Sequence, residues 1–279
     1  MTIKEALNNS INILKQRNIE SPIQIAKIVL SHVLQQNKEY ILINENEILK
    51  DEIYEEFIKK VEKISLGTPV QYVTNKQEFM DMEFFVDENV LIPRPDTEIL
   101  VEEVLELINK KNNLSIIDMC TGSGAIAISL AKYTENNKIC AVDISSEALE
   151  VAKKNAIKNG VDEKIEFINS NMFENVNDNE KFDVIVSNPP YIESEVVLTL
   201  DKQVQHEPKI ALDGGVDGLD FYRKLLESSK RCLKENGIIA MEIGYNQREA
   251  VTNLFKTEYK NVYCKKDLAG NDRVIVCRN

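Results

Sequence analysis

The sequence has few basic residues for its length. Its 279 residues include 34 Lys and Arg against 46 Asp and Glu, which gives a formal net charge of -12 at pH 7. A protein whose main partner is duplex nucleic acid normally has a basic footprint that matches the phosphates. The composition therefore disfavours nucleic acid as the main partner, although net charge alone can hide a local basic patch.

Long apolar runs and paired cysteines are also missing. No run approaches the roughly 20 apolar residues of a membrane span, and the amino terminus has no apolar stretch of signal-peptide length. The five cysteines are odd in number and form no Cys-x-x-Cys pair, so neither a zinc site nor a disulfide framework is indicated. We expect a soluble, monomeric, cytoplasmic protein without a metal or a membrane partner.

What is present is enough for a packed core. Hydrophobic residues make up 43% of the chain, and the first part has helical periodicity, with apolar residues on one face between Ile3 and Leu14. A second helix begins at Ser21 and Pro22, and a third extends from about Ile48 to Ile64. We predict a small all-helical domain over residues 1–75.

The pattern changes between Gly67 and Pro93. Short apolar stretches over 79–86 and 90–92 are typical of strands or a hairpin. We therefore predict a β-hairpin connector over residues 76–92, between the helical domain and the rest of the chain.

Strands and helices alternate from residue 93 to the end. The expected strands are 114–119, 139–142, 165–169, 182–187 and 238–243, and the expected helices are 96–110, one from 123, 146–158, 219–235 and 246–256. Such alternation predicts a mostly parallel sheet with helices on both faces. Two final strands, 261–264 and 273–277, are close enough in sequence to form an antiparallel hairpin at the sheet edge.

A glycine-rich turn joins the first of these strands to its helix. The segment Asp118-Met119-Cys120-Thr121-Gly122-Ser123-Gly124 ends the strand, and its glycines let a ligand approach the backbone. A dinucleotide fingerprint would need a third glycine, and a phosphate-binding loop would need a Gly-Lys-Ser/Thr ending. The turn therefore predicts a bound cofactor but leaves its class open.

Asp143 lies at the tip of the second strand. A carboxylate there can accept hydrogen bonds from both ribose hydroxyls of a nucleoside, and this geometry serves NAD and S-adenosylmethionine equally. Alternatively, Asp143 caps the helix that follows. The two roles can coexist only if the two carboxylate oxygens are divided between them.

The segment Asn188-Pro189-Pro190-Tyr191 follows the strand 182–187, at an edge where open α/β sheets bind ligands. Two consecutive prolines donate no N–H and hold the chain extended, which leaves carbonyl oxygens free to face a ligand. Taken alone, the segment could be a simple turn. Together with the glycine turn and Asp143, it predicts a reacting site rich in acceptors.

Such a site suits a planar nitrogen. The lone pair of an amide or conjugated amine is delocalised, so the nitrogen must be held in line with an electrophile. The Asn188 side-chain carbonyl and the Pro189 backbone carbonyl can accept its two N–H groups, while Tyr191 stacks on the plane. Positioning of this kind can lower the activation barrier by several kcal/mol without a titrating base.

The order of these motifs resembles the Rossmann-like class I methyltransferases. The resemblance implies S-adenosylmethionine as the cofactor, a seven-stranded mixed sheet with the last strand antiparallel, and adenine beside Asn171 and Met172. The sequence departs from the family at Cys120, where a glycine is common, and at Asn171-Met172, where an acidic and an aromatic residue often occur. The cofactor-binding residues that the resemblance implies are Asp118, Cys120, Thr121, Gly122, Ser123, Gly124, Asp143, Asn171, Met172 and Asn188.

Further segments resemble the peptide chain release factor glutamine methyltransferases. They are residues 69–79, Leu91-Ile92-Pro93-Arg94-Pro95-Asp96-Thr97-Glu98, the helical domain, and His206-Glu207-Pro208. That family methylates the side-chain nitrogen of the glutamine in the Gly-Gly-Gln loop of bacterial class 1 release factors and so modulates translation termination. The acidic charge fits a protein substrate, and the helical domain is expected to dock it.

The resemblance also implies a substrate site. Asn188, Pro189 and Tyr191 are its expected catalytic residues, and the expected substrate-binding residues are Asn188, Pro189, Pro190, Tyr191, Phe79, Arg94, Pro95 and Glu207, with Pro208 at the rim. Alternatively, Phe79 packs in the core, Arg94 forms a structural ion pair and Glu207 is solvated.

Three other functions remain open at the level of the sequence. The same chemistry could act on a glutamine of a ribosomal protein, or on an exocyclic amine of DNA or RNA. The chain could also be a non-catalytic S-adenosylmethionine sensor that binds a partner through its helical domain. The expected fold class is the same in each case: an α/β Rossmann-like methyltransferase domain over 93–279, behind the helical domain and the hairpin.

Overall fold

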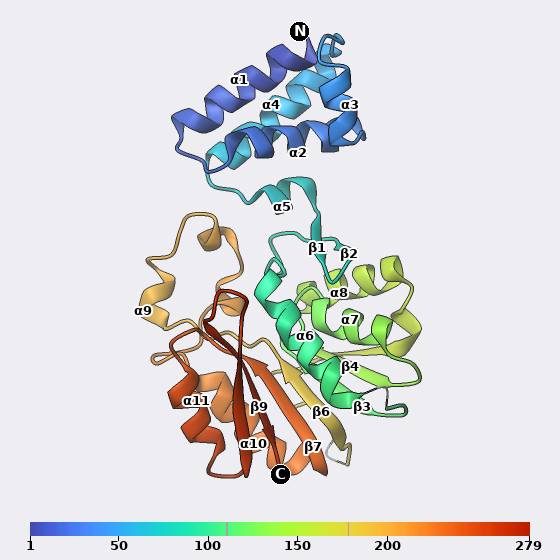
Figure 1. Cartoon of the computed structure of the whole chain (residues 1–279), viewed down its shortest axis with the longest axis vertical. Coiled ribbons are helices and arrows are strands. Elements are labelled where there is room, and N and C mark those ends of the chain that lie inside the picture. The colour runs from blue at the N-terminus through green and yellow to red at the C-terminus, as the bar shows by residue number, and fades with distance from the viewer. Residues whose placement is uncertain (110, 178) are drawn as a thin grey trace. The chain divides into compact units, whose positions relative to one another are not determined.

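A computed structural model describes residues 1–109, 111–177 and 179–279 (Figure 1). The chain divides into two compact units, one formed by Met1–Lys76 with Asp201–His206 and the other by Gln77–Leu200 with Glu207–Asn279. Within the described residues, no helix combines the length and the apolar character that a membrane crossing requires.

The smaller unit is helical. Its helices are α1 (Ile3–Gln16), α2 (Pro22–Leu34), α3 (Lys38–Ile43), α4 (Asp51–Ser65) and α5 (Val70–Thr74), with the short turn η2 (Val204–His206). The Thr2 hydroxyl and the Glu5 carboxylate cap the start of α1 reciprocally. Buried side chains such as Leu14, Leu30 and Phe57 form one apolar cluster between these helices, as the periodicity predicts.

The larger unit begins with the hairpin of β1 (Gln77–Phe79) and β2 (Met82–Phe84). Met80 and Asp81 form its tight turn, both with positive φ. The rings of Phe79 and Phe84 meet edge to face at 6.0 Å and belong to the core of this unit.

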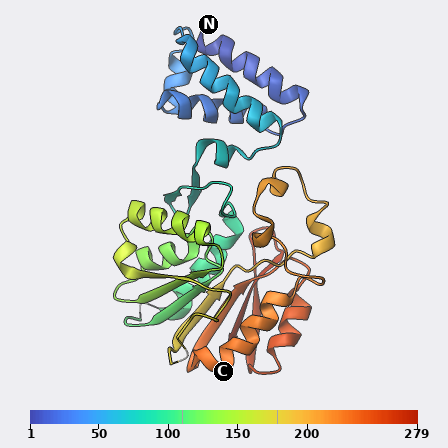
Figure 2. The same cartoon turned by 180° about the vertical axis from the view of Figure 1, so that it is seen from behind.

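A seven-stranded sheet dominates this unit (Figures 1 and 2). Its strands are β3 (Ser115–Met119), β4 (Lys138–Asp143), β5 (Ile165–Asn169), β6 (Phe182–Ser187), β7 (Leu233–Glu242), β8 (Asn261–Lys266) and β9 (Asp272–Arg278). They lie in the order β5-β4-β3-β6-β7-β9-β8, and β9 is antiparallel to both of its neighbours. The predicted mixed sheet and the edge hairpin are confirmed, and the last strand enters the sheet between β7 and β8.

Helices cover both faces of the sheet. They are α6 (Pro95–Ile108), α7 (Ala125–Tyr133) and α8 (Ser146–Asn159) on one face, and α10 (Asp220–Cys232) and α11 (Arg248–Phe255) on the other. Alternate strand residues point to opposite faces. Ile116 therefore packs in the cluster under α6 and α7, while Ile117 packs in the cluster with α10 and α11.

Several boundaries differ from the predicted ones, and residues 90–92 form no strand. The helix expected over 219–235 ends at Cys232, because Leu233 already pairs with Phe182 at the start of β7. The helix expected over 96–110 runs from Pro95 to Ile108, and residue 110 lies outside the described residues. Short elements that were not predicted are α3, α5, α9 (Ser194–Val197), η1 (Asp162–Lys164), η2 and η3 (Lys209–Ala211).

Candidate functional site

The turn after β3 is built around the carboxylate of Asp118. Its Oδ2 accepts hydrogen bonds from the Thr121 hydroxyl at 2.6 Å and from the Ala127 amide at 3.1 Å. Burial raises the pKa of Asp118 to about 7 against these two bonds, and Oδ1 has no hydrogen-bond partner among the described residues. Asp118 thus shapes the turn and the start of α7 from beneath.

Gly124 allows this turn to pack closely on its neighbours. The residue has φ +82°, and a Cβ there would lie 2.8 Å from Ile128 Cδ1 and 3.1 Å from Ala152 Cβ. Gly122, with φ +54°, has open space on the same side of its backbone. Cys120 takes a left-handed conformation as well, although it has a side chain.

The carboxylate of Asp143 joins the turn to the end of β4. Its Oδ2 accepts from the Gly122 amide at 2.8 Å and its Oδ1 accepts from the Ser145 amide at 3.0 Å. Ser145, not Asp143, caps α8, since its hydroxyl accepts from the Ala148 amide. Each Asp143 oxygen therefore keeps lone-pair capacity for a further donor.

Asp143 lines a cavity at the carboxyl ends of β3, β4 and β6. The space within its lining, open solvent at the mouth included, is about 890 Å³. It is lined by Asn89, Val90, Leu91, Met119, Cys120, Gly122, Val142, Asp143, Ile144, Ser145, Ala148, Ser170, Asn171, Met172, Asn188, Pro190, Pro208, Ile210, Ala211, Phe221 and Lys224. Most of this lining is apolar, and the carboxylate is its main acidic group.

Six of the ten expected cofactor residues reach this cavity, and four do not. The six are Cys120, Gly122, Asp143, Asn171, Met172 and Asn188. The four are Asp118, Thr121, Ser123 and Gly124, which lie in the turn itself. Burial, with the nearby Asp143 and Asp118 carboxylates, raises the pKa of the Cys120 thiol, whose Sγ lies 4.0 Å from Met172 Sδ.

The segment Asn188 to Tyr191 leaves the end of β6 beside the same cavity. The Ser187 hydroxyl donates to the Met119 carbonyl at 2.6 Å and ties β6 to β3 at this edge. Asn188 Nδ2 donates to Thr97 Oγ1 at 3.1 Å, and the Tyr191 hydroxyl donates to Glu242 Oε1 at 3.2 Å. Burial and the Glu242 charge raise the pKa of Tyr191, so its hydroxyl remains protonated.

A second chain segment holds Tyr191 from its other side. Ile192 pairs with Asp213, and Gly214 lies so close that a Cβ there would be 2.7 Å from Tyr191 Cα. The Gln247 side-chain amide donates to the Tyr191 carbonyl at 2.9 Å. The backbone after the two prolines is therefore fixed by contacts and does not depend on a ligand.

The expected substrate residues divide into groups. Asn188 and Pro190 line the cavity, whereas Pro189 and Tyr191 lie next to them without lining it. Pro95 is exposed and begins α6. The contacts of these residues with a substrate remain predictions.

Arg94 and Glu207 pair with each other. The Arg94 guanidinium forms an ion pair with Glu207 Oε1, and Glu207 Oε2 accepts from the Ile92 amide at 3.0 Å. Glu207 is buried, so the solvated alternative is wrong, and the ion pair that was the alternative for Arg94 is present. Phe79 was expected to line the pocket. The residue is instead 1% exposed and packs in the core of the sheet unit, which was the alternative.

Several residues of the site were not found from the sequence. Phe221 and Lys224 line the cavity from α10, and their spacing is that of any amphipathic helix, so the sequence carries no signal for them. Glu242 had a signal, since it is a carboxylate inside the apolar run Ile238–Ile243. Thr97 had a sequence signal as well, because it lies in the segment 91–98 that resembles the methyltransferase family.

Two family models match the chain. The one described as Methyltransferase small domain matches residues 95–270, and the one described as PrmC N-terminal domain matches residues 5–74. Together they span the sheet unit and the helical unit.

Similar proteins agree with these matches. A protein of Clostridium acetobutylicum named Release factor glutamine methyltransferase is 39% identical over 99% of this chain and 98% of its own length. One of the same name from Clostridium botulinum is 38% identical over 100% and 99%. The solved Thermus thermophilus 16S rRNA N2 G1207 methyltransferase, in complex with AdoMet and guanosine, shares the fold at 16% identity, with a TM-score of 0.51 over 73% of this chain and 49% of that one.

Proposed function

Because the chain belongs to the release factor glutamine methyltransferase family, we propose that it methylates the glutamine of bacterial class 1 release factors. The methyl group goes from S-adenosylmethionine to the side-chain amide nitrogen of the glutamine in the Gly-Gly-Gln loop. The reaction modulates translation termination, and we propose that the enzyme acts in the cytoplasm as a monomer.

One observation carries this proposal: Asp143 and Asn188 line the same cavity from the ends of two strands that flank β3. The Asp143 carboxylate can accept hydrogen bonds from the ribose of a nucleoside, and the Asn188 side chain can accept one from an amide. A site that must bring a cofactor and a planar nitrogen together needs both in one cavity.

The cavity fits S-adenosylmethionine. The spare lone pairs on both oxygens of Asp143 match the two hydroxyls of a ribose, and the apolar surface of Met172 suits the flat adenine. When bound, the cofactor would supply a methyl group on a positively charged sulfur; its transfer would leave a neutral thioether, and the surplus amide proton would pass to water. Cys120 and Gly122 also line the cavity.

The residues of this chain contribute orientation. The Asn188 carbonyl oxygen accepts one N–H of the glutamine amide, and the Pro189 carbonyl accepts the other, so the nitrogen faces the methyl group. The raised pKa of Tyr191 keeps its hydroxyl protonated, which leaves its ring to stack on the amide plane and excludes it as a base. Alignment of this kind suffices because the cofactor is already activated.

The protein substrate needs a docking region. The acidic net charge of -12 disfavours a nucleic acid in that place. We expect the helical unit to supply the docking surface, since the cavity itself lies wholly within the sheet unit.

A transfer assay tests the proposal. The purified protein is incubated with S-adenosylmethionine labelled in its methyl group and with a class 1 release factor, or with the same factor carrying Gln→Ala in the Gly-Gly-Gln loop. We expect label on the wild-type factor alone, on a peptide that contains the loop. Equal labelling of both factors, or preferred labelling of ribosomal proteins, DNA or RNA in parallel reactions, would overturn it.

An active-site control separates an enzyme from a sensor. The Asn188→Ala variant should still bind S-adenosylmethionine, measured by calorimetry, with a small rise in Kd because Asn188 lines the cavity, and it should lose transfer to the release factor. A wild-type protein that binds the cofactor and the factor but never transfers the label is a sensor instead.

A further inference from the structure

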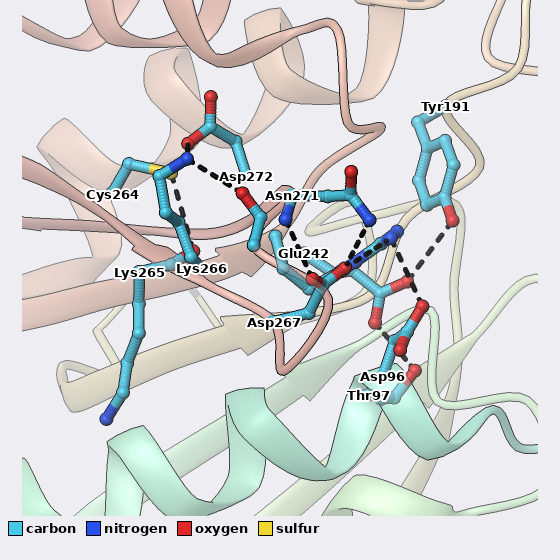
Figure 3. A network of polar contacts seen from close by, with 12 residues as sticks. Asp96, Thr97, Tyr191, Glu242, Cys264, Lys265, Lys266, Asp267, Asn271 and Asp272 are labelled. Carbon is cyan, nitrogen blue, oxygen red and sulfur yellow. Dashed lines mark hydrogen bonds and ion pairs between the residues drawn. The ribbon is translucent and has the colours of Figure 1, made fainter.

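A buried carboxylate lies behind the reacting segment. Glu242 is the last residue of β7 and is 1% exposed. Its Oε2 accepts from the Thr97 hydroxyl at 2.6 Å, and Thr97 Oγ1 in turn accepts from Asn188 Nδ2 at 3.1 Å. Figure 3 shows Thr97 and Tyr191 approaching the two ends of the Glu242 carboxylate.

The direction of this chain follows from its protons. An ionised carboxylate only accepts, so the single hydroxyl proton of Thr97 points to Glu242. Thr97 Oγ1 then has only lone pairs to offer to Asn188, which must present its NH₂ group and not its oxygen. The carbonyl oxygen of Asn188 is thereby turned away from Thr97.

Tyr191 is tied to the same carboxylate. Its hydroxyl donates to Glu242 Oε1 at 3.2 Å, and the buried Tyr222 hydroxyl donates to the Glu242 backbone carbonyl at 2.9 Å. One carboxylate thus fixes both an amide orientation and an aromatic ring in the segment that follows β6.

Neighbouring groups stabilise the ionised form of Glu242 against the effect of burial. Burial raises the pKa of Glu242, while the hydrogen bond from Thr97 and the positive charge of Arg273 oppose that rise. Arg273 is itself held by Asp96 and Asp267, each at 3.1 Å from its Nη2. Asp96, on the same helix as Thr97, adds a smaller negative charge that raises the pKa of Glu242 further.

We propose that Thr97 and Glu242 are positioning residues, which force Asn188 to aim its carbonyl oxygen at the substrate amide. This inference rests on the proposed function. An amide group is nearly symmetric in shape, so packing alone does not distinguish its oxygen from its nitrogen. A flipped Asn188 would present NH₂ to a substrate NH₂, and two donors cannot form a hydrogen bond.

The test compares four variants of the full chain, and a fifth, Asn188→Asp, serves only to assign a signal. Thr97→Val removes the hydroxyl with little change in shape, and Glu242→Gln turns the acceptor into a group that also donates. Thr97→Ser restores the hydroxyl. The matched control is Ser229→Ala, because Ser229 is also 1% exposed and its hydroxyl both donates to Leu226 and accepts from Tyr259.

Two readouts are needed. One is kcat for methyl transfer to a release factor, with the Kd of S-adenosylmethionine measured beside it. The other is the side-chain ¹⁵N–¹H amide signal of Asn188, identified by its loss in Asn188→Asp. The second readout does not depend on any substrate.

We expect Thr97→Val and Glu242→Gln to lower kcat about 10- to 100-fold, as loss of alignment does, with the cofactor Kd unchanged. Thr97→Ser should retain most of the wild-type kcat, and Ser229→Ala should leave it unaltered. The Asn188 amide signal should shift in Thr97→Val and not in Ser229→Ala.

Folded Thr97→Val and Glu242→Gln proteins with wild-type kcat would overturn the inference. So would an Asn188 amide signal that is the same in Thr97→Val as in the wild type. If Glu242→Gln does not fold, Thr97→Val decides alone. If the wild type itself transfers no methyl group to a release factor, the proposed function fails, and the amide signal still tests the hydrogen bond between Thr97 and Asn188.

Discussion

The Gly122 amide donates a 2.8 Å hydrogen bond to Oδ2 of Asp143, so the glycine turn after β3 is fastened to the carboxylate at the end of β4. The bond makes the shape of the turn depend on a residue of the neighbouring strand. It also orients the carboxylate within the cavity before any ligand arrives, which reduces the entropy that binding would otherwise cost.

Replacing Asp143 by Asn should weaken cofactor binding. The new NH₂ group must replace the oxygen that accepts either the Gly122 amide or the Ser145 amide, and a charge-assisted bond of about 1.5–3 kcal/mol is lost. We expect the Kd of S-adenosylmethionine to rise about 10- to 100-fold by calorimetry. Asp183→Asn is the control, because Asp183 also accepts a backbone amide, that of Ser115, and does not line the cavity. An unchanged Kd in Asp143→Asn would remove Asp143 from the binding site.

The two glycines of the turn should respond differently to alanine. At Gly122 the left-handed φ costs about 1–2 kcal/mol, and the new methyl group meets nothing within 4 Å. At Gly124 the same cost is joined by contacts at 2.8 and 3.1 Å, which add about 1–3 kcal/mol of overpacking. Urea unfolding should therefore rank Gly124→Ala as the less stable variant. Cofactor affinity should fall chiefly in Gly122→Ala, since Gly122 lines the cavity. A less stable Gly122→Ala would contradict the predicted order of stability, and a weaker affinity in Gly124→Ala would contradict the predicted order of affinity.

Asp118 should make stability depend on pH in a specific direction. Burial raises its pKa from 3.8 to about 7 in the folded chain. The folded state therefore holds a proton that the unfolded state releases, and this contribution is complete below pH 4 and is lost as pH rises through 7. Between pH 5 and 8 the free energy of unfolding of the wild type should fall relative to that of Asp118→Asn, by about 1–3 kcal/mol. Parallel pH profiles for the two proteins would show that the carboxylate is already ionised at pH 5.

The effects of replacing Arg94 and Glu207 on the free energy of unfolding should be coupled. Arg94→Ala leaves a buried carboxylate with the Ile92 amide as its remaining hydrogen-bond donor, which should cost about 1–3 kcal/mol of unfolding free energy. Adding Glu207→Gln removes the unpaired charge and should recover part of that loss. A double-mutant cycle in urea measures the coupling. Additive single effects would mean that the pair contributes nothing, and a change in the KM for the release factor alone would assign Arg94 to the substrate.

The sequence predicted the parts of the site that depend on local patterns. The strands that end at Met119, Asp143 and Ser187 were evident from apolar runs followed by glycine, acid or proline, and parallel pairing brings such ends to one edge. The start of β7 was not predictable in the same way. Leu233 continues the helical pattern of α10, and only its pairing with Phe182, 51 positions earlier, makes it a strand residue.

Side-chain partners were beyond the reach of sequence patterns. From the sequence alone, Phe79 could face a ligand. In the structure its ring packs against that of Phe84. The contacts of Thr97 with Asn188 and Glu242 join residues 91 and 145 positions apart, and no local periodicity encodes them. Such contacts depend on the tertiary arrangement of α6, β6 and β7.

Gly214 has no side chain, yet substitutions at Gly214 should abolish activity as substitutions at Asn188 are expected to. Any Cβ at this position would meet the backbone of Tyr191 at 2.7 Å and the Pro190 carbonyl at 2.8 Å. Every substitution there must displace the segment that aims the substrate. Loss of activity on mutation is therefore a poor guide to chemistry along this loop, and a directed-evolution library aimed at new substrates should hold position 214 fixed and vary its neighbours.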